Sequence, residues 1–420
     1  MKVLFIANSV YIPDEKRKTV TGYDYIVSEI AQKLSEKCNI DLYLLRPYQH
    51  CCKVNAVSIL GHSYKDLIKY IKFRDIPTYF RIAFKDKTDV KSRIRNVFYY
   101  LTMRDIERLI RENKYDIVHI HGVEFMDVVA SIAAAKCKIP FLFTLHGLLS
   151  YGDVPNISQI DKDSEQAVLN LVRDNNFVIT TVSTGTKKIP CVDKKISLDK
   201  VVVVNNAVKI ADVSEVSDWK TKYPQLGEKK VFLSVGSVCQ RKNQIQLLRA
   251  YNLLPDIIKS KSMVFLAGQD LSGGVVEEYV EKHNLKNDVV LCGFLTKKEL
   301  AGLYQIAHYN ALLSISEGFG LSMIEAAKYG IPTLTFSDLD AAKDVYSPDS
   351  MLLLDNRSDE TVADGLIKMM TKEWNKDTII KSVDRFNEDI YFQYWEVYRQ
   401  IIKNKTNLVK PKVVLEALGL

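Results

Sequence analysis

Residues 314–332 read SISEGFGLSMIEAAKYGIP, and this order predicts a strand, a glycine turn and a helix in succession. The apolar run ends near Ile315, and the helix then begins near Leu321 and ends at Gly330, with a proline two residues beyond. Elsewhere, short β-rich runs alternate with longer amphipathic stretches, a pattern typical of parallel sheets with helical crossovers. The sequence therefore predicts an α/β fold with two doubly wound sheets in series. Strands are expected at 3–7, 40–45, 116–120, 141–145, 178–182 and 201–204, and again at 231–235, 263–267, 288–291, 311–315, 333–336 and 351–354.

The turn before that helix is suited to binding an anion. Gly318 and Gly320 allow close backbone approach, and a helix that begins at Leu321 offers unpaired N–H groups and a partial positive charge. Glu317 lies beside the turn and Glu325 about two turns into the helix, where carboxylates can accept hydrogen bonds from hydroxyls. Hydroxyl-rich ligands that carry phosphate are sugar nucleotides. The alternative is an ordinary strand–turn–helix corner with two surface glutamates.

A second glycine turn lies upstream. The strand at 231–235 ends at Gly236, and Arg241 and Lys242 follow in the next turn. Two cations after such a turn can reach a pyrophosphate, Arg241 with two hydrogen bonds and Lys242 as a point charge. A solvated basic helix start is the alternative, but a helix N-terminus disfavours cations that have no anion to meet.

The chain length predicts two domains, because 420 residues exceed what a single core usually supports. The hydrophobic pattern lapses between 205 and 230, so we expect an N-terminal domain at 1–205 and a C-terminal domain at 206–383. A helix at about 384–403 is expected to pack back onto the N-terminal domain. Residues 404–420 are expected to form a loosely attached tail.

The motif residues resemble those of the family 4 retaining glycosyltransferases with the GT-B fold. The resemblance is carried by Gly236 with Lys242, and by the EGFG turn at 317–320 with Glu325. It covers nearly the whole chain. It implies two Rossmann-like domains that face each other across a cleft, with the donor sugar nucleotide held by the C-terminal domain.

The resemblance also implies a role for each matching residue. Arg241 and Lys242 would contact the donor pyrophosphate, Glu325 the ribose and Glu317 the donor sugar. The implied catalytic residues are His146 and Glu317, and the implied donor-binding residues are Gly22, Gly236, Arg241, Lys242, Phe294, Leu295, Gly318, Phe319, Gly320, Leu321 and Glu325. Phe294 and Leu295 belong to the region that usually lies on the nucleobase.

The chain departs from the family pattern at two places. The family has a glycine-rich loop after the first strand, and residues 21–24 retain only Gly22, with Thr21 in the companion position. Ser237 stands where the family often carries arginine. Arg241 would supply the missing charge.

His146 follows the strand at 141–145 and so lies at the edge where α/β sheets place ligands. It matches the active-site histidine of the family. The resemblance implies that it hydrogen-bonds the donor sugar or stabilises charge as the glycosidic bond loosens.

No metal or other cofactor is expected. His119 and His121 share one strand face, but no third ligand accompanies them, so we interpret both as packing or cleft-lining residues. Asp338 and Asp340 form a D-x-D, the metal signature of the other large glycosyltransferase fold, but we interpret its late position as coincidental. The HCC run at 50–52 is not interpreted as a metal site.

Composition indicates a globular protein located in the cytoplasm. Apolar residues make up 47% and charged residues 26%, and a net charge of +7 is too modest to indicate nucleic-acid binding. The sequence has no apolar run of about 18 residues and no signal-peptide pattern. Seven cysteines without a C-x-x-C pair fit reduced thiols.

Residues 64–112 are rich in lysine and arginine, with aromatic residues interleaved. A solvated helical face with its aromatics in the core is one interpretation. The other is a peripheral surface that contacts anionic lipid at the inner face of the plasma membrane, with a glycan or lipid-linked acceptor. The aromatic residues are Phe73, Tyr79, Phe80, Phe84, Phe98, Tyr99 and Tyr100.

The predicted activity is transfer of a hexosyl group from a nucleoside-diphosphate sugar to an acceptor hydroxyl, in polysaccharide or lipopolysaccharide biosynthesis. The family implies retention, and no carboxylate of the N-terminal half stands out as a nucleophile, so attack and departure on one face are expected. Two alternatives remain open. A sugar-nucleotide 2-epimerase of the same fold would convert the donor without an acceptor, and a catalytically silent partner subunit would bind it without turnover.

Overall fold

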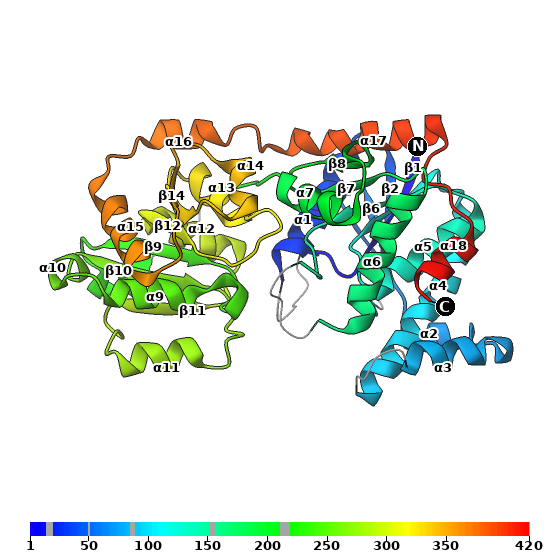
Figure 1. Ribbon diagram of the computed structural model, residues 1–420, viewed down its shortest axis with the longest axis horizontal. Coiled ribbons are helices and arrows are strands. Elements are labelled where there is room, and N and C mark those ends of the chain that lie inside the picture. Colours follow the sequence, from blue (N-terminus) through cyan, green and yellow to red (C-terminus); the bar gives the residue numbers. More distant parts are fainter. Residues whose placement is uncertain (14–19, 49–50, 85–88, 152–156, 211–218, 420) are drawn as a thin grey trace. The chain divides into compact units, whose positions relative to one another are not determined.

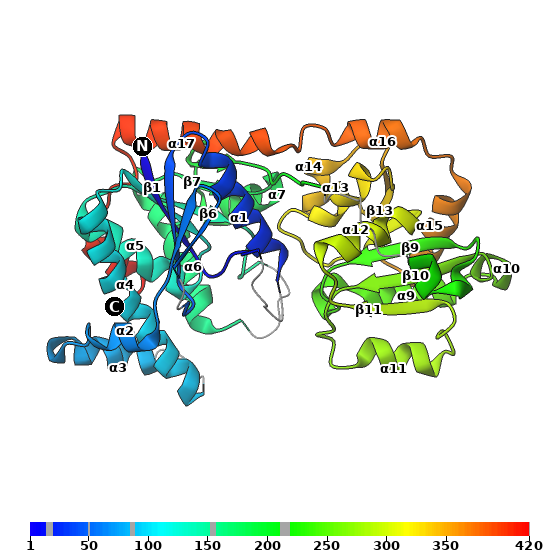
Figure 2. The same ribbon diagram turned by 180° about the vertical axis from the view of Figure 1, so that it is seen from behind.

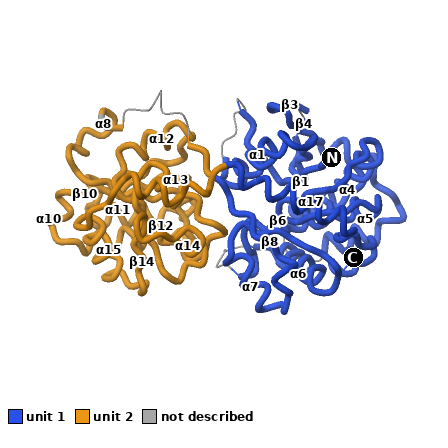
Figure 3. Tube along the Cα trace, turned by 90° about the horizontal axis from the view of Figure 1, so that it is seen from above, with its two compact units in different colours: residues 1–207, 388–420 blue, residues 208–387 orange. Residues whose placement is uncertain are grey.

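The chain folds into two compact units. The computed structural model describes residues 1–13, 20–48, 51–84, 89–151, 157–210 and 219–419 (Figure 1). Unit 1 comprises residues 1–207 and 388–420, and unit 2 comprises residues 208–387 (Figure 3). Each unit contains a largely parallel sheet with helices packed on it, which confirms the predicted α/β class with two doubly wound sheets.

Unit 1 is built on a sheet with the order β3-β4-β2-β1-β5-β6-β7-β8. Adjacent strands are parallel except for β3, which runs antiparallel to β4. The strands are β1 (Lys2–Ala7), β2 (Asn39–Leu44), β3 (Cys52–Val54), β4 (Val57–Leu60), β5 (Ile117–His121), β6 (Phe141–Leu145), β7 (Ile179–Thr181) and β8 (Val201–Val203). The main helices are α1 (Gly22–Leu34), α2 (Tyr64–Ile68), α3 (Ile76–Phe84), α4 (Val90–Asn113), α5 (Phe125–Cys137), α6 (Gln159–Asp174), α7 (Thr184–Lys194), α17 (Phe392–Asn404) and α18 (Pro411–Ala417).

The centre of this sheet fixes where a ligand can bind. Residues 3–7 are buried on both faces of β1, as expected for an apolar strand covered by helices on each side. The chain places β2 on one side of β1 and β5 on the other. The carboxyl ends of β1 and β5 therefore border the switch point, where α/β sheets bind ligands.

Unit 2 repeats this plan with the order β11-β10-β9-β12-β13-β14, all parallel. Its switch point lies between β9 and β12. The strands are β9 (Lys230–Val235), β10 (Ser262–Ala267), β11 (Val289–Gly293), β12 (Tyr309–Leu312), β13 (Thr333–Phe336) and β14 (Met351–Leu354). The helices are α8 (Trp219–Lys222), η4 (Gln240–Lys242), α9 (Gln244–Asn252), α10 (Asp256–Lys259), α11 (Val275–Lys282), α12 (Lys297–Ile306), α13 (Leu321–Lys328), α14 (Asp340–Val345), α15 (Asp359–Thr371) and α16 (Lys376–Ser382) (Figure 2).

Every predicted strand is present, with ends shifted by at most three residues. The largest shift is at β12, which ends at Leu312, so that eight residues rather than a tight corner connect it to α13. The hairpin of β3 and β4 was not predicted, because strands of three and four residues are too short to show a period.

The ends of the two units differ slightly from the expected boundaries. Unit 1 extends to Ala207, two residues beyond the predicted limit, and the chain re-enters it at Glu388. Part of the expected polar linker, 211–218, lies outside the described residues. Trp219 and Leu226 farther along it are buried in the core of unit 2.

The C-terminal helix begins later than predicted and packs on unit 1. A short turn at Glu388–Tyr391 leads into α17, and residues 384–387 are not helical. Tyr398 of α17 is fully buried, and its hydroxyl lies 2.6 Å from Nδ1 of His119 in β5. The helix therefore covers the N-terminal sheet (Figures 1 and 2).

The expectation of a loosely attached tail after residue 404 is wrong. Asn407 is fully buried, and its amide donates to the carbonyls of Phe141 (2.8 Å) and Val178 (2.7 Å), while its Oδ1 accepts from the N–H of Val178 (2.8 Å). Val414 of α18 is buried between α5 and α6. A buried side chain that satisfies backbone groups of two strands anchors this segment.

In the described part of the chain, no helix is both long and apolar enough to cross a membrane.

Replacement of Asn407 by alanine is expected to lower the free energy of unfolding by about 2 to 4 kcal/mol, because three buried backbone groups lose their partner. Denaturant unfolding measures this. Asn404→Ala, an exposed change in the same segment, should stay within about 0.5 kcal/mol of the wild type. Equal stability of the Asn407→Ala variant and the wild type would contradict the anchor.

Candidate active site

The loops that leave β9 and β12 meet at the switch point of unit 2. The two strands are hydrogen-bonded neighbours, and the sheet grows away from them in opposite directions. The first loop carries Gly236, Arg241 and Lys242, and the second carries residues 317–320. The structure thus brings together two motifs that the sequence separates by about 75 residues.

The loop after β9 packs against its own lysine. Gly236 has φ +136°, and a Cβ at this position would lie 3.0 Å from Cε of Lys242. Buried Gln244 closes the loop, since its amide donates to the carbonyl of Ser237 (3.1 Å) and its Oε1 accepts from the N–H of Cys239 (3.2 Å). Sequence reasoning missed Gln244, because its role depends on the loop conformation and not on a motif.

The carboxylate of Glu317 lies at the centre of this arrangement. Its Oε1 is 2.5 Å from Nζ of Lys242 and accepts from Oγ of Ser314 at 2.7 Å, and its Oε2 is 3.4 Å from Nη1 of Arg241. Burial would raise the pKa of Glu317, but the charges of Lys242 and Arg241 and the two hydrogen bonds outweigh it and hold the pKa below its usual value. Glu317 is therefore ionised at neutral pH.

Arg241 ties the two loops together. Its Nη1 donates to the carbonyl of Ser316 at 2.9 Å, and its own carbonyl accepts from the N–H of Ile315 at 2.8 Å. Two cations against one carboxylate leave a net positive charge at the switch point.

The start of α13 adds hydrogen-bond donors to that charge. Gly320 has φ +77°, and among the described residues the N–H groups of Phe319, Gly320 and Leu321 have no hydrogen-bond partner. Gly318 is half-buried in the same turn. The predicted helix start at Leu321 is confirmed, and its free N–H groups and dipole favour an anion.

Glu325 lies in the second turn of α13 and is held by a tyrosine. The hydroxyl of Tyr304 donates to its Oε2 at 2.9 Å, and the ring of Tyr304 stacks on that of Tyr329 with centroids 5.0 Å apart. Burial raises the pKa of Tyr304 far above its usual value, so this hydroxyl stays a donor. The ribose contact of Glu325 stays a prediction.

Phe294 and Leu295 follow β11 at the same carboxyl edge. Gly293 has φ +68°, its carbonyl accepts from the N–H of Gly268 at 2.9 Å, and the ring of Phe294 is 40% exposed. β11 is two strands from β9, a distance of about 10 Å. The predicted contact of Phe294 and Leu295 with a nucleobase stays a prediction.

In unit 1, His146 follows β6 at the carboxyl edge. Its Nε2 lies 3.1 Å from Nδ1 of His121, and its ring meets that of Tyr23 edge-on, with centroids 5.1 Å apart. Burial lowers the pKa of His146 to about 4. His146 is thus a neutral ring at physiological pH.

Gly22 is the first residue of α1, and Thr21 is the residue that caps this helix. The side chain of Thr21 accepts from the N–H of Asp24, and the carboxylate of Asp24 accepts from the N–H of Thr21 at 2.7 Å. This capping box explains why threonine occupies the position where the family has glycine. Gly22 is exposed, and its contact with donor phosphate stays a prediction.

Sequence reasoning missed a group of polar residues at the switch point of unit 1. Nδ2 of Asn8 after β1 donates to Oε2 of Glu124 at 3.2 Å. Gly122 has φ +131°, and a Cβ there would lie 2.3 Å from Oδ2 of Asp127. Burial and the neighbouring Glu124 raise the pKa of Asp127. Their position just after a predicted strand was the available signal.

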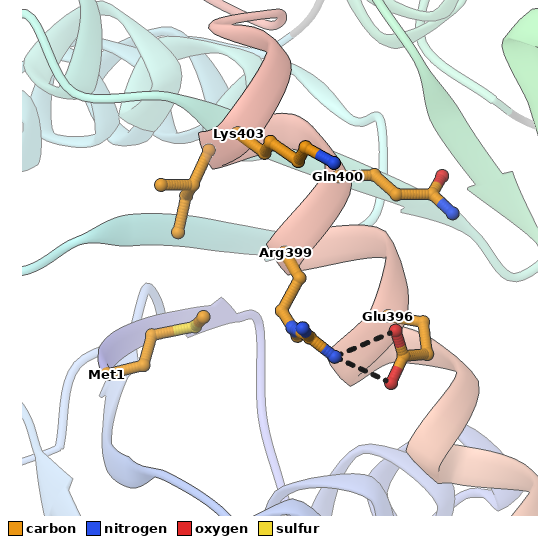
Figure 4. Close-up of a pocket in the computed structure, with 6 residues that line it drawn as sticks. Met1, Glu396, Arg399, Gln400 and Lys403 are labelled. Atoms are coloured by element: carbon orange, nitrogen blue, oxygen red, sulfur yellow. Dashed lines mark hydrogen bonds and ion pairs between the residues drawn. The ribbon is translucent and has the colours of Figure 1, made fainter.

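Two cavities lie away from these edges. One, of about 400 Å³, is lined by α17 and the N-terminus and contains the Arg399–Glu396 ion pair (Figure 4). The other, of about 780 Å³, lies at the amino edge of the unit 2 sheet, between Tyr309 and Trp374. Neither is lined by a residue that we predicted for the site.

Within the described ranges, no group of three or more histidine, cysteine or acidic side chains is placed to hold a metal. His50 of the HCC run lies outside those ranges. Asp338 is paired with Arg357 at 2.7 Å, and Asp340 with Lys343 at 2.6 Å. The two aspartates of the D-x-D are thus engaged in ion pairs.

Comparison with known proteins gives matches to both halves of the chain. The family model described as Glycosyltransferase Family 4 matches residues 59–212, and the model described as Glycosyl transferases group 1 matches residues 215–388. The glycosyltransferase MJ1607 of Methanocaldococcus jannaschii is 23% identical over 315 residues, which cover 73% of this chain and 77% of the relative. The UDP-Gal:alpha-D-GlcNAc-diphosphoundecaprenol alpha-1,3-galactosyltransferase of Escherichia coli is 25% identical over 250 residues, or 54% of this chain and 59% of that protein.

Solved structures share the fold over nearly the whole chain. Sucrose-phosphate synthase from Thermosynechococcus elongatus gives a TM-score of 0.72 at 15% identity, covering 96% of this chain and 99% of that one. HepE from Anabaena, in complex with UDP and glucose, gives 0.66 at 15% identity, covering 95% and 100%.

The buried pair of Lys242 and Glu317 can be tested by a double-mutant cycle. Lys242→Met and Glu317→Gln should each destabilise unit 2, because Glu317 would keep only the longer 3.4 Å pairing with Arg241, and Lys242 would lose its ion pair. The double variant should be more stable than the sum of the two losses implies, by about 1 to 3 kcal/mol. Denaturant unfolding provides the four free energies. Additive losses would show that the two charges do not interact.

Proposed function

The chain belongs to the family 4 glycosyltransferases and has their GT-B fold, and from this premise we propose that it transfers a hexosyl group from a nucleoside-diphosphate sugar to an acceptor hydroxyl with retention. The observation that carries the proposal is the buried Glu317 carboxylate held between Lys242 and Arg241 at the switch point of unit 2. The E. coli relative is named for a UDP-galactose donor and a lipid-diphosphate acceptor. This name supports a sugar nucleotide as donor and a lipid-linked glycan as acceptor, and we propose that the acceptor belongs to polysaccharide or lipopolysaccharide assembly.

The diphosphate would lie over the loop after β9 and the start of α13. Lys242 has three N–H donors and uses one of them on Glu317, so it can bind phosphate without leaving the carboxylate. Arg241 and the N–H groups at 319–321 would neutralise the charge that develops on the leaving diphosphate. No metal ion is part of this proposal.

Glu317 would orient the cations and accept a hydrogen bond from the donor sugar. The bond from the anomeric carbon to the phosphate oxygen breaks, and a bond to the acceptor oxygen forms on the same face of the sugar. The acceptor proton passes to the departing phosphate oxygen, so charge and atoms balance. His146 would donate a hydrogen bond to the sugar, and Glu325 would hold the ribose.

The donor assignment predicts different effects for two substitutions. A panel of sugar nucleotides, scored by thermal shift and then by turnover, first identifies the donor. Glu317→Gln should lower kcat by about 100-fold or more, the size of effect seen when a preorganised group is lost. It should keep nucleoside-diphosphate affinity within about threefold, because both cations remain. Lys242→Met should weaken that affinity about tenfold or more, since a charge-assisted contact is lost.

Calorimetry with the nucleoside diphosphate and steady-state kinetics separate the two effects. The exposed change Lys343→Met, also in unit 2, is the matched control and should alter neither. Loss of diphosphate binding in Glu317→Gln would place Glu317 on the nucleotide and overturn its role. Conversion of the donor without an acceptor would identify a 2-epimerase, and binding without turnover a silent subunit.

We further propose that unit 1 contacts an anionic membrane through α2, α3 and the start of α4, and that the protein works at the cytoplasmic face. Phe73 is 91%, Phe80 61% and Phe84 64% exposed. The interpretation that the aromatics lie in the core holds for Tyr99 and Tyr100 of α4, which are buried, and in part for Tyr79 of α3, which packs against the core of unit 1. The same segment carries exposed lysines and arginines, and the combination of exposed rings and basic side chains is suited to lipid headgroups: Lys65, Lys69, Lys72, Arg74, Arg81, Lys91 and Arg95.

Co-sedimentation with vesicles that contain an anionic phospholipid tests this surface. The triple variant Phe73→Ser/Phe80→Ser/Phe84→Ser should bind at least about tenfold more weakly, because each ring contributes about 1.5 to 3 kcal/mol when it leaves water. Binding by the wild type should also fall as salt rises. The control is the triple variant Ile257→Ser/Leu271→Ser/Val275→Ser, which replaces exposed apolar residues of unit 2 and should not change vesicle binding. Equal binding by both triple variants would contradict the proposal.

A further inference from the structure

Two histidines from adjacent strands of unit 1 share a hydrogen bond. His121 is the last residue of β5 and pairs in register with Thr144 of β6, two residues before His146. Nδ1 of His121 lies 3.1 Å from Nε2 of His146. His121 is fully buried, and His146 is half-buried at the edge of the sheet.

Neighbouring residues contact both the ring and the backbone of His121 and restrict its movement. Its ring packs at a tilt against Phe5, with centroids 4.9 Å apart and planes 40° apart, and against His119, with centroids 4.0 Å apart and planes 38° apart. Its backbone carbonyl accepts from the hydroxyl of Tyr23 at 2.6 Å, and Tyr23 also packs on His146. The ring of His121 therefore cannot turn to exchange its two nitrogens without moving these neighbours.

Both ring nitrogens of the neighbouring His119 have hydrogen-bond partners other than His121. Its Nδ1 lies 2.6 Å from the hydroxyl of Tyr398, and its Nε2 lies 2.6 Å from Oγ1 of Thr144. Thr144 is 2.5 Å from Oγ1 of Thr180, which reaches the carbonyl of Phe143 at 3.2 Å. One direction satisfies every member: Tyr398 donates to His119, His119 to Thr144, Thr144 to Thr180, and Thr180 to the carbonyl. His119 thus offers His121 no hydrogen bond.

A single proton lies between His121 and His146, because burial lowers the pKa of both rings and keeps both neutral. Either His121 donates from Nδ1 or His146 donates from Nε2. Nε2 of His121 is buried and has no partner among the described residues. In the second assignment, His146 donates, so His121 must carry its own proton on Nε2, and this buried N–H would have no acceptor. In the first assignment, Nε2 of His121 is a bare nitrogen that accepts no hydrogen bond. Buried orphaned N–H groups are the rarer of the two, so the first assignment is favoured.

We propose that His121 is a positioning residue for His146: it donates from Nδ1 to Nε2 of His146, so that His146 carries its proton on Nδ1 and presents it as a hydrogen-bond donor to the substrate. Nδ1 of His146 has no partner within the described residues. The part that concerns substrate rests on the proposed function, whereas the proton position stands on the histidine pair alone. A neutral N–H donor suits a sugar oxygen, which is a hydrogen-bond acceptor.

The proton position can be read directly. Protein labelled with ¹⁵N at histidine gives long-range ¹H–¹⁵N correlations that distinguish a protonated ring nitrogen from a bare one, and His146→Ala identifies the signals of His146. We expect His146 to be protonated on Nδ1 and bare on Nε2, and His121 to be protonated on Nδ1. A wild-type His146 that is protonated on Nε2 would overturn the proposal without any activity measurement.

Substitutions at His121 then test its effect on turnover. His121→Asn places an amide N–H close to the position of Nδ1 and should retain the His146 tautomer and most of kcat. His121→Leu has nearly the same size but no donor, so His146 should become a mixture of tautomers. Its kcat should fall about 10- to 100-fold with little change in donor KM, the usual range for loss of a group that orients another side chain. Thermal unfolding shows whether each variant is folded.

Wild-type kcat and an unchanged tautomer in His121→Leu would overturn the positioning role. An equal loss of kcat in folded Asn and Leu variants would overturn it as well, because a merely structural role would not distinguish them. If no sugar nucleotide is turned over by the wild type, the proposed function fails while the tautomer measurement still decides the proton position.

Discussion

The C-terminal unit of this protein depends on one buried carboxylate. A charge removed from water is tolerated only when it is paired, and Glu317 is paired with Lys242 and Arg241 from a different loop. The pairing fixes the loops after β9 and β12 relative to each other. Their cations and the free N–H groups at the start of α13 are therefore in place before any anion arrives, so that binding requires little reorganisation.

The two units differ in the charge that their polar residues carry. Each places its polar residues at a switch point, where adjacent strands send their loops to different sides of the sheet. Unit 2 keeps its site charged, which suits a diphosphate. Unit 1 keeps its histidines neutral, since burial lowers the pKa of His119, His121 and His146 alike. A neutral site that directs hydrogen bonds is suited to sugar hydroxyls.

The sequence predicted the fold well because apolar strands and glycine turns are local signals. It placed His146, Lys242 and Glu317 at strand ends, but the contact between Lys242 and Glu317 depends on strand order, which no local pattern contains. Gln244 acts through bonds within its own loop, whose conformation no motif shows, and His121 acts through a bond to the end of the neighbouring strand, so neither could be recognised as a partner beforehand. The buried Asn407 was missed for the same reason: polar tails usually lie in water, and this one replaces backbone partners between two strands.

Hydrogen exchange of the whole protein, with and without saturating nucleoside diphosphate, tests most directly whether the switch point of unit 2 is the donor site. The amides of residues 236–243 and 317–322 should exchange more slowly when the ligand is bound, because the diphosphate covers these N–H groups and holds both loops closed. The outer helix α11, in the same unit, should be unaffected. Protection confined to other segments, with these two loops unchanged, would contradict the account.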